Sequence, residues 1–338
     1  MKETSLFAKK NKILFLMIIM TLAVSLVLGG CNNGTPSTSS EPEQDTPQQN
    51  TPGESSTDAN PENSKVRSTQ LVKEFEALVQ RTGNLPQAFQ FINEHINELT
   101  SEDTSHILFA LEDVQIKELA GFVNRYFEGN IQEQLTSIYK IDDSLNDLID
   151  KADDESLKSL LTETQDSGYL LSIAEGMFAP VIDYSKVSHN LEKATDEIKA
   201  YFELRETESQ KHSLSDAALV ISWEELLNRG LAAERFTTKY PNAVRIKEVI
   251  SLRDNYIAVI FYGANNTPLF DYDTKIMDSD ARKAYETVLS TNTGNADSTL
   301  MQDLEAFMST AAKENYKLTE VLKKQQSKFV PSVEESSS

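Results

Sequence analysis

Apolar residues recur every three or four positions along most of residues 66–330. That spacing is the period of an α-helix with one buried face. The apolar stripes of the first half are Leu71, Phe75, Leu78 and Val79; Phe89, Ile92, Ile96 and Leu99; Ile107, Leu111, Val114, Leu119, Phe122 and Tyr126; and Ile131, Leu135, Ile138, Leu145 and Ile149. Those of the second half are Val187, Leu191, Ile198, Tyr201 and Phe202; Val220, Trp223, Leu227 and Leu231; and Ile246, Ile250, Ile257 and Ile260. The sequence therefore predicts a mainly α fold, either a helical array or a bundle.

Residues that favour helix ends separate several of these stripes. Pro86 suits a first helical turn, Thr100 or Ser101 can cap the next helix, and Gly129 marks where that helix ends. Near the C-terminus we expect one long helix, capped by Asp297 or Ser298. Its stripe is Leu300, Leu304, Phe307, Met308, Ala311, Leu318 and Leu322. The acidic, serine-rich residues 331–338 are predicted to be a disordered tail.

The helical period breaks near residues 168–185. Two β-rich runs, 169–174 and 177–184, flank Glu175-Gly176, which predicts one small β-hairpin. Pro180 cannot donate to a strand ladder, so its strand should lie at an edge. A buried irregular loop is the alternative. The same break near 166–186 can divide the helical domain, residues 66–330, into two subdomains.

The N-terminus has the order of a secretory signal: a basic patch, an apolar run over residues 13–28, and small residues. Leu28-Gly29-Gly30-Cys31 resembles the lipobox of bacterial lipoproteins, in which the cysteine receives diacylglycerol. The resemblance implies that residues 1–30 are cleaved and that Cys31 is lipidated. It also implies anchoring at the extracytoplasmic face of the cell membrane. The alternative is an uncleaved membrane anchor, because the run approaches the ~20 residues that span a bilayer.

Residues 31–65 form a predicted tether between this anchor and the helices. From Asn32 to Ser64 the only aliphatic residue is Ala59, among Ser, Thr, Pro, Asn, Gln, Gly and acids. Such a segment cannot bury enough apolar surface to offset the entropy of ordering it. We expect a disordered linker that separates the helical domain from the membrane by about 30 Å on average.

The chain is strongly acidic, with a formal net charge of −21. Cleavage of residues 1–30 would remove four basic residues and one acid and so bring it to −24. This charge argues against nucleic acid as a partner. It favours cationic partners, or serves solubility alone.

No catalytic signature is present in the sequence: there is no nucleophile elbow, phosphate loop, dinucleotide fingerprint or HExxH. The four histidines have no metal-ligand spacing. Asp271, Asp273, Asp278 and Asp280 alternate loosely with other residues, but an EF-hand would need an oxygen ligand at Lys275 and a glycine at Ile276. We therefore expect no metal and no cofactor, and an enzyme is the less favoured class.

Two segments differ from ordinary helix surface and are the candidate binding sites, since loops carry recognition more often than helix faces do. One is the hairpin, with Glu175, Asp183 and Tyr184. The other is the connection 263–271, a polar turn followed by apolar residues that look exposed. Its candidate residues are Asn265, Asn266 and Thr267. The alternative is that the asparagines cap helices and Phe270 packs into the core.

A second resemblance is local. Ala232-Ala233-Glu234-Arg235-Phe236 followed by Tyr240-Pro241-Asn242 resembles one helix–turn–helix joint of tetratricopeptide-type envelope proteins. It covers about a tenth of the chain, without the 34-residue period of those repeats. It implies two antiparallel helices joined at residues 240–242.

These observations favour a helical binding module in a Gram-positive-type cell envelope, with envelope proteins or a cell-wall component as partners. One alternative is a cell-wall hydrolase that uses paired carboxylates such as Glu175 and Asp183. Another is a solute-binding receptor, although such receptors are usually two-lobed α/β proteins with several parallel strands.

Overall fold

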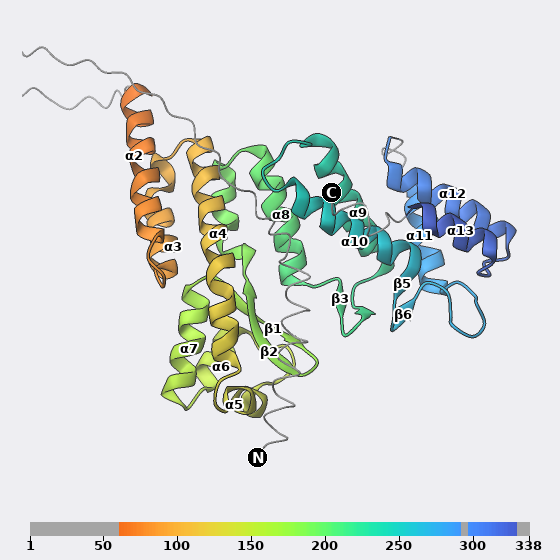
Figure 1. Cartoon of the computed structure of the whole chain (residues 1–338), viewed down its shortest axis with the longest axis horizontal. Coiled ribbons are helices and arrows are strands. Elements are labelled where there is room, and N and C mark those ends of the chain that lie inside the picture. Colours follow the sequence, from red (N-terminus) through yellow and green to blue (C-terminus); the bar gives the residue numbers. More distant parts are fainter. Residues whose placement is uncertain (1–60, 292–296, 330–338) are drawn as a thin grey trace, which may run out of the picture.

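The computed structural model describes residues 61–291 and 297–329, and helices dominate that part of the chain (Figure 1). The described strands form three antiparallel sheets of two strands each. The predicted mainly α fold with a small hairpin is confirmed. Residues 1–30, the lipidation site Cys31 and the tail 331–338 lie outside the described residues. Within the described ranges, no helix combines the length and apolarity needed to cross a bilayer.

Three helices form the N-terminal side of the molecule: α2 (Pro61–Val79), α3 (Leu85–His95) and α4 (Ser101–Tyr126). Helix α2 begins inside the predicted tether, because Pro61 is suited to a first turn, where its missing N–H costs nothing. Pro86 lies in the first turn of α3, as expected. A short 3₁₀ helix, η1 (Ile96–Glu98), precedes α4. The hydroxyl of Thr100 caps α4 by accepting from the Asp103 N–H at 3.1 Å.

A small second core lies under the lower end of α4. Helices α5 (Ile131–Ile138), α6 (Leu145–Lys151) and α7 (Glu155–Asp166) surround it. Ser144 and Asp147 begin α6 with a capping box, and Asp154 caps α7. The buried residues of this core are Tyr126, Leu135, Leu148, Ala152, Leu157, Leu160, Leu161 and Phe178.

The predicted hairpin forms from β1 (Tyr169–Ala174) and β2 (Met177–Ile182). Its turn has φ 49° at Glu175 and 71° at Gly176, the backbone that matches the twist of a two-residue hairpin. Tyr169 and Ile182 belong to the large core, whereas Phe178 belongs to the small one. The hairpin therefore joins the two cores. The large core includes residues on both sides of 166–186, from Phe75 to Leu322.

The chain then runs through a 3₁₀ helix, η2 (Tyr184–Lys193), where an α-helical stripe was predicted, and through α8 (Asp196–Gln210). Helices α9 (Trp223–Lys239) and α10 (Ile246–Tyr262) pack closely beside each other. A Cβ atom on Gly230 of α9 would lie 3.1 Å from Ile260 of α10, so the helices approach at a residue without a side chain. Trp223 is buried and meets the ring of Tyr285 edge-on.

The C-terminal side contains α11 (Ser279–Thr291), α12 (Thr299–Lys313) and α13 (Glu320–Phe329). Ser298 caps α12, as predicted. The prediction of one long helix is wrong, because Asn315 and Tyr316 have φ 55° and 56° and turn the chain back. Two hairpins complete the fold: β3 (Leu214–Ser215) with β4 (Ala218–Leu219), and β5 (Gly263–Ala264) with β6 (Thr267–Pro268). They lie below α9 and α10 in Figure 1, on the side of β1 and β2.

Candidate recognition surface

The two predicted binding loops meet through a third turn, Asp216-Ala217 of the β3–β4 hairpin. The backbone N–H of Glu175 donates to the Asp216 carboxylate at 3.0 Å. From the other side, Asn266 donates its backbone N–H to the Ala217 carbonyl at 2.8 Å and its side-chain amide to the Asp216 carbonyl at 2.6 Å. We call the resulting surface, formed by residues 175–176, 216–217 and 265–266, the three-turn surface.

The side chains of the three-turn surface point outward. Glu175, Asp216, Asn265 and Asn266 are exposed. Thr267 is half-buried, and its hydroxyl accepts from the Leu219 N–H at 3.1 Å, which fixes β6 beside β4. The side chains of Asp216 and Asn266 thus bond to a neighbouring turn, whereas those of Glu175 and Asn265 face solvent.

Tyr272 extends this surface beyond the β5–β6 hairpin. Its hydroxyl donates to the Asn265 carbonyl at 3.0 Å, while 60% of the residue stays exposed. The alternative that Phe270 packs into the core is confirmed: Phe270 and Leu269 are both buried, because the chain turns inward after Pro268 to complete the large core. An exposed aromatic residue, Tyr272, follows directly after this connection.

Asp183 and Tyr184 lie away from the three-turn surface. Asp183 caps η2, accepting from the N–H and hydroxyl of Ser185 and from the amide of Gln210. Tyr184 is only 3% exposed and donates to Glu112 at 2.7 Å, as does Tyr201. Burial raises the pKa of Tyr184 above its ordinary value. Both side chains therefore make contacts within the fold, and the structure does not bring them together with Glu175.

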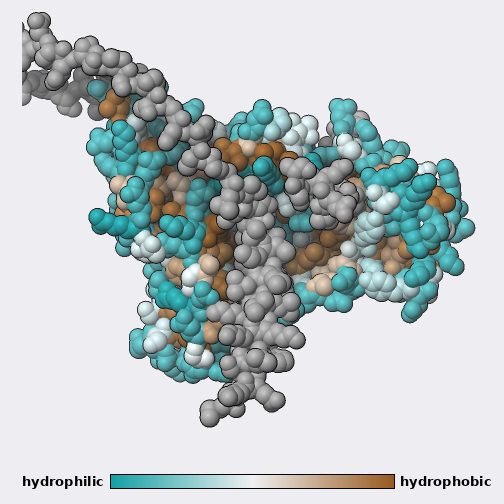
Figure 2. Space-filling model, in the orientation of Figure 1, coloured by the Kyte–Doolittle hydropathy of each residue, from teal (hydrophilic) through white to brown (hydrophobic). Residues whose placement is uncertain are grey.

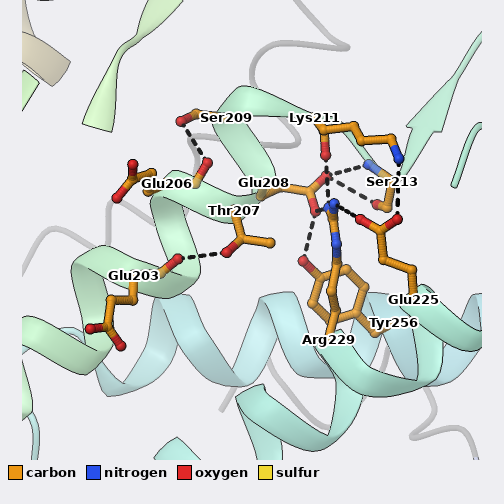
Figure 3. Close-up of polar contacts among 10 residues, drawn as sticks. All are labelled: Glu203, Glu206, Thr207, Glu208, Ser209, Lys211, Ser213, Glu225, Arg229 and Tyr256. Carbon is orange, nitrogen blue, oxygen red and sulfur yellow. Dashed lines mark hydrogen bonds and ion pairs between the residues drawn. The ribbon is translucent and has the colours of Figure 1, made fainter. Parts of the chain in front are cut away.

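A buried ion cluster anchors the base of the β3–β4 hairpin (Figure 3). The carboxylate of Glu208, on α8, accepts from the N–H of Ser213 at 2.8 Å and from its hydroxyl at 3.0 Å. It also accepts from Tyr256 of α10 at 2.6 Å and from Arg229 of α9 at 2.9 Å. Three helices thus hold the residue that immediately precedes β3.

Arg229 completes the cluster. Its side chain is 6% exposed, donates to the Lys211 carbonyl at 2.7 Å and pairs with Glu225, which also binds Lys211. Burial opposes the positive charge, but the bonds from Glu225 and Glu208 outweigh it and raise the pKa of Arg229. The guanidinium therefore stays charged and holds residues 211–213 against α9.

His212 connects the same segment to the first hairpin. Its Nε2 lies 3.2 Å from the hydroxyl of Ser172 on β1, so residues 212 and 216 contact β1 and its turn at two points. The β3–β4 hairpin is thus fixed at its base by Glu208 and Arg229 and at its tip by the other two turns.

Two surface hollows lie on the described part. One, of about 440 Å³, lies between α8, α9 and α10 beside the ion cluster, and its lining includes Thr207, Ser222, Glu225, Arg229 and Tyr256. The other, of about 480 Å³, lies between α3 and α7. The second hollow is lined mainly by polar and charged side chains, among them Lys158, Ser159 and Glu163 of α7. Among the residues that the structure describes, no three His, Cys, Asp or Glu side chains converge as metal ligands would.

Sequence reasoning missed the β3–β4 hairpin and the Glu208–Arg229 pair. Asp216 is a turn-favouring residue, but the Ala217 that follows it is not, and each strand has only two residues. Glu208 and Arg229 are 21 residues apart, a spacing without any motif.

Comparison of the chain with protein-family profiles, curated proteins and solved structures finds no match.

Proposed function

We propose that this chain is an extracytoplasmic binding module of the cell envelope, anchored to the membrane through lipid on Cys31. The lipobox-like residues 28–31 supply the anchor, and the polar residues between Cys31 and Pro61 connect it to the helices. The three-turn surface contacts the partner, an envelope protein. No catalytic step is part of this proposal.

The observation that carries the proposal is the convergence of three turns from distant parts of the chain. The bonds at Asp216 span 41 residues to Glu175 and 50 residues to Asn266. Loops held on a rigid scaffold are the usual place of recognition, because little conformational entropy is lost when they bind. The exposed side chains of Glu175 and Asn265 are then free to contact a partner.

The geometry favours this module over a hydrolase that uses Glu175 and Asp183. These residues lie at opposite ends of the six-residue strand β2. At about 3.3 Å per residue, the strand separates them by about 20 Å. The two carboxylates of a glycosidase lie about 5–9.5 Å apart, so this pair does not have the required separation. The antiparallel two-stranded sheets also differ from the parallel sheets typical of solute receptors.

Site-specific photo-cross-linking in intact cells tests the proposal. A photoreactive amino acid replaces Asn265 on the three-turn surface or, as a control, the exposed Glu305 of α12. We expect a discrete cross-linked protein from position 265 and none of that size from position 305. The product should disappear with Cys31→Ser, which removes the anchor. Equal labelling from both positions, or labelling from 305 alone, would contradict the proposal.

A further inference from the structure

Exposed apolar side chains gather beside the three-turn surface. Leu214 is 38% exposed, Val220 48%, Tyr262 45% and Tyr272 60%. All four belong to the β3–β4 and β5–β6 hairpins or adjoin them. Figure 2 shows hydrophobic residues on the visible face in the region where Figure 1 places β3, β5 and β6. Scattered exposed apolar residues are ordinary, whereas a contiguous apolar area with a polar rim is typical of an interaction site.

The contacts between the hairpins make this area continuous. The Leu219 N–H donates to the Thr267 hydroxyl, and Tyr272 donates to the Asn265 carbonyl. The β3–β4 hairpin, with Leu214 in β3 and Val220 directly after β4, therefore lies beside the loop that carries Tyr272. Leu214 pairs with Leu219 across the β3–β4 hairpin, so these residues share one small sheet.

The rim of the area carries carboxylates that no described cation neutralises through an ion pair. Glu175, Asp216 and Asp273 are exposed. Of the neighbouring lysines, Lys211 pairs with Glu225, whereas Lys275 donates to the Tyr272 carbonyl and keeps its single positive charge against the three carboxylates. The local charge is therefore negative, in the same sense as the net charge of the chain.

We infer that the three-turn surface and its apolar neighbours dock a polypeptide segment that presents Lys or Arg side chains next to an apolar one. This inference rests on the proposed function and names the partner's chemistry. Cations are attracted both to free carboxylates and to the face of an exposed tyrosine. A second copy of this chain, nucleic acid and anionic polymers would all meet repulsion from the acidic rim.

Fluorescent peptides tested against the full chain in detergent measure this chemistry. The first probe is a twelve-residue peptide of alternating lysine and leucine; the second replaces lysine by glutamate, and the third replaces leucine by serine. We expect binding of the first probe, weakening of it by added salt, at least tenfold weaker binding of the third, and none of the second. Equal binding of the first and third would show that charge alone acts, and would overturn the inference.

Matched substitutions locate the binding. A triple variant, Glu175→Gln, Asp216→Asn and Asp273→Asn, removes the three rim charges. The asparagine at position 216 still has a side-chain oxygen that can accept from the N–H of residue 175. We expect this triple variant to bind the first probe about tenfold more weakly, because three exposed ion pairs with the peptide are lost. Tyr272→Ala should weaken binding by a similar factor.

The control variant removes three exposed carboxylates elsewhere: Asp142→Asn, Asp150→Asn and Asp153→Asn, between α5 and α7. It has the same net charge as the rim variant and should bind the first probe within twofold of the original chain. Equal weakening by both triple variants would overturn the inference, since binding would then follow net charge. Folding of each variant is checked by its melting temperature.

The two proposals fail separately. A cross-linked partner at position 265 whose contacting segment is acidic or uncharged would overturn the inference about chemistry and leave the binding module standing. Both proposals would be overturned if no cross-link formed at position 265 and the rim variant bound the first probe as tightly as the original chain.

Discussion

The side-chain amide of Asn266 donates a hydrogen bond of 2.6 Å to the backbone carbonyl of Asp216, which lies 50 residues earlier in the chain. Asn265 is equally exposed, but its side chain makes no such bond to the neighbouring hairpin. Two adjacent asparagines therefore differ in role: Asn266 fixes the position of a turn, and Asn265 is free to contact a partner.

This difference predicts different costs for the two alanine variants. Asn266→Ala should lower the free energy of unfolding by about 1 kcal/mol, the usual contribution of one hydrogen bond. Asn265→Ala should change it by less than about 0.5 kcal/mol, as surface substitutions usually do. Urea denaturation of both variants measures the difference. Equal effects would show that the bond between the turns contributes nothing to stability.

A substitution at Ala217 is expected to stabilise the protein. Its φ of 58° lies in the left-handed region, where the Cβ of alanine is unfavourable and glycine is not. Ala217→Gly should therefore raise the free energy of unfolding by about 0.5–1 kcal/mol, and Ala217→Val should lower it. Because the Ala217 carbonyl still accepts from Asn266, partner binding should not weaken in the glycine variant. A destabilised glycine variant would refute the turn geometry.

Much of the fold was predictable because apolar spacing and end signals agree. Thr100, Pro86 and Ser298 each lie where a helix begins, and Glu175-Gly176 forms the expected turn. The last helix was not predictable in the same way. Its stripe continues from Leu304 to Leu318 without Gly or Pro, so only the left-handed backbone at residues 315–316 reveals the break.

The candidate site was predictable only in its parts. Glu175 and Asn266 belong to turns that the sequence marks, but their meeting depends on Asp216, which binds both. Tyr184 follows the β1–β2 hairpin, and its position in the sequence suggests that it belongs to the same surface. Its hydroxyl instead donates to the buried Glu112 of α4. Such tertiary contacts have no local signal, because the two partners are 72 residues apart.

The anchor gives a prediction that does not depend on the fold. Cys31→Ser removes the thiol that would accept the lipid, so the precursor should stay unprocessed or the protein should be released from cells. Detergent partitioning and the size of the mature protein on a gel measure this outcome. A Cys31→Ser chain that is processed to the same size and extracted only with detergent would refute lipidation at this residue.

The buried tyrosines predict a loss of stability at alkaline pH. Burial raises the pKa of Tyr184, Tyr201 and Tyr285 above their ordinary value of 10.0. Above about pH 10 the unfolded chain loses these protons and the folded chain keeps them. Their contribution is therefore complete below that pH and is lost as pH rises, by about 1.4 kcal/mol per pH unit for each tyrosine.

Tyrosinate absorbance, followed together with circular dichroism, measures this coupling. We expect the buried tyrosines to ionise only as the helices unfold. Tyr285→Phe should reduce the dependence of stability on pH above 10, whereas Tyr272→Phe, at an exposed position, serves as the control. Complete ionisation while the helical signal is unchanged would contradict the burial of these hydroxyl groups.

The last prediction concerns the pair that anchors the β3–β4 hairpin. Arg229→Met leaves the carboxylate of Glu208, 8% exposed, without its cation. An unpaired buried charge costs about 3–5 kcal/mol, so the variant should be destabilised by roughly that amount. Adding Glu208→Gln removes the charge and should restore part of the loss.

Lys323→Met, which breaks the exposed pair with Glu320, is the control and should cost less than about 1 kcal/mol. Hydrogen exchange at Ser213 should accelerate in Arg229→Met, because Glu208 holds that N–H. If Arg229→Met costs no more than Lys323→Met and the exchange at Ser213 is unchanged, the cluster does not fix the hairpin, and the rigidity of the three-turn surface must come from the contacts between its turns.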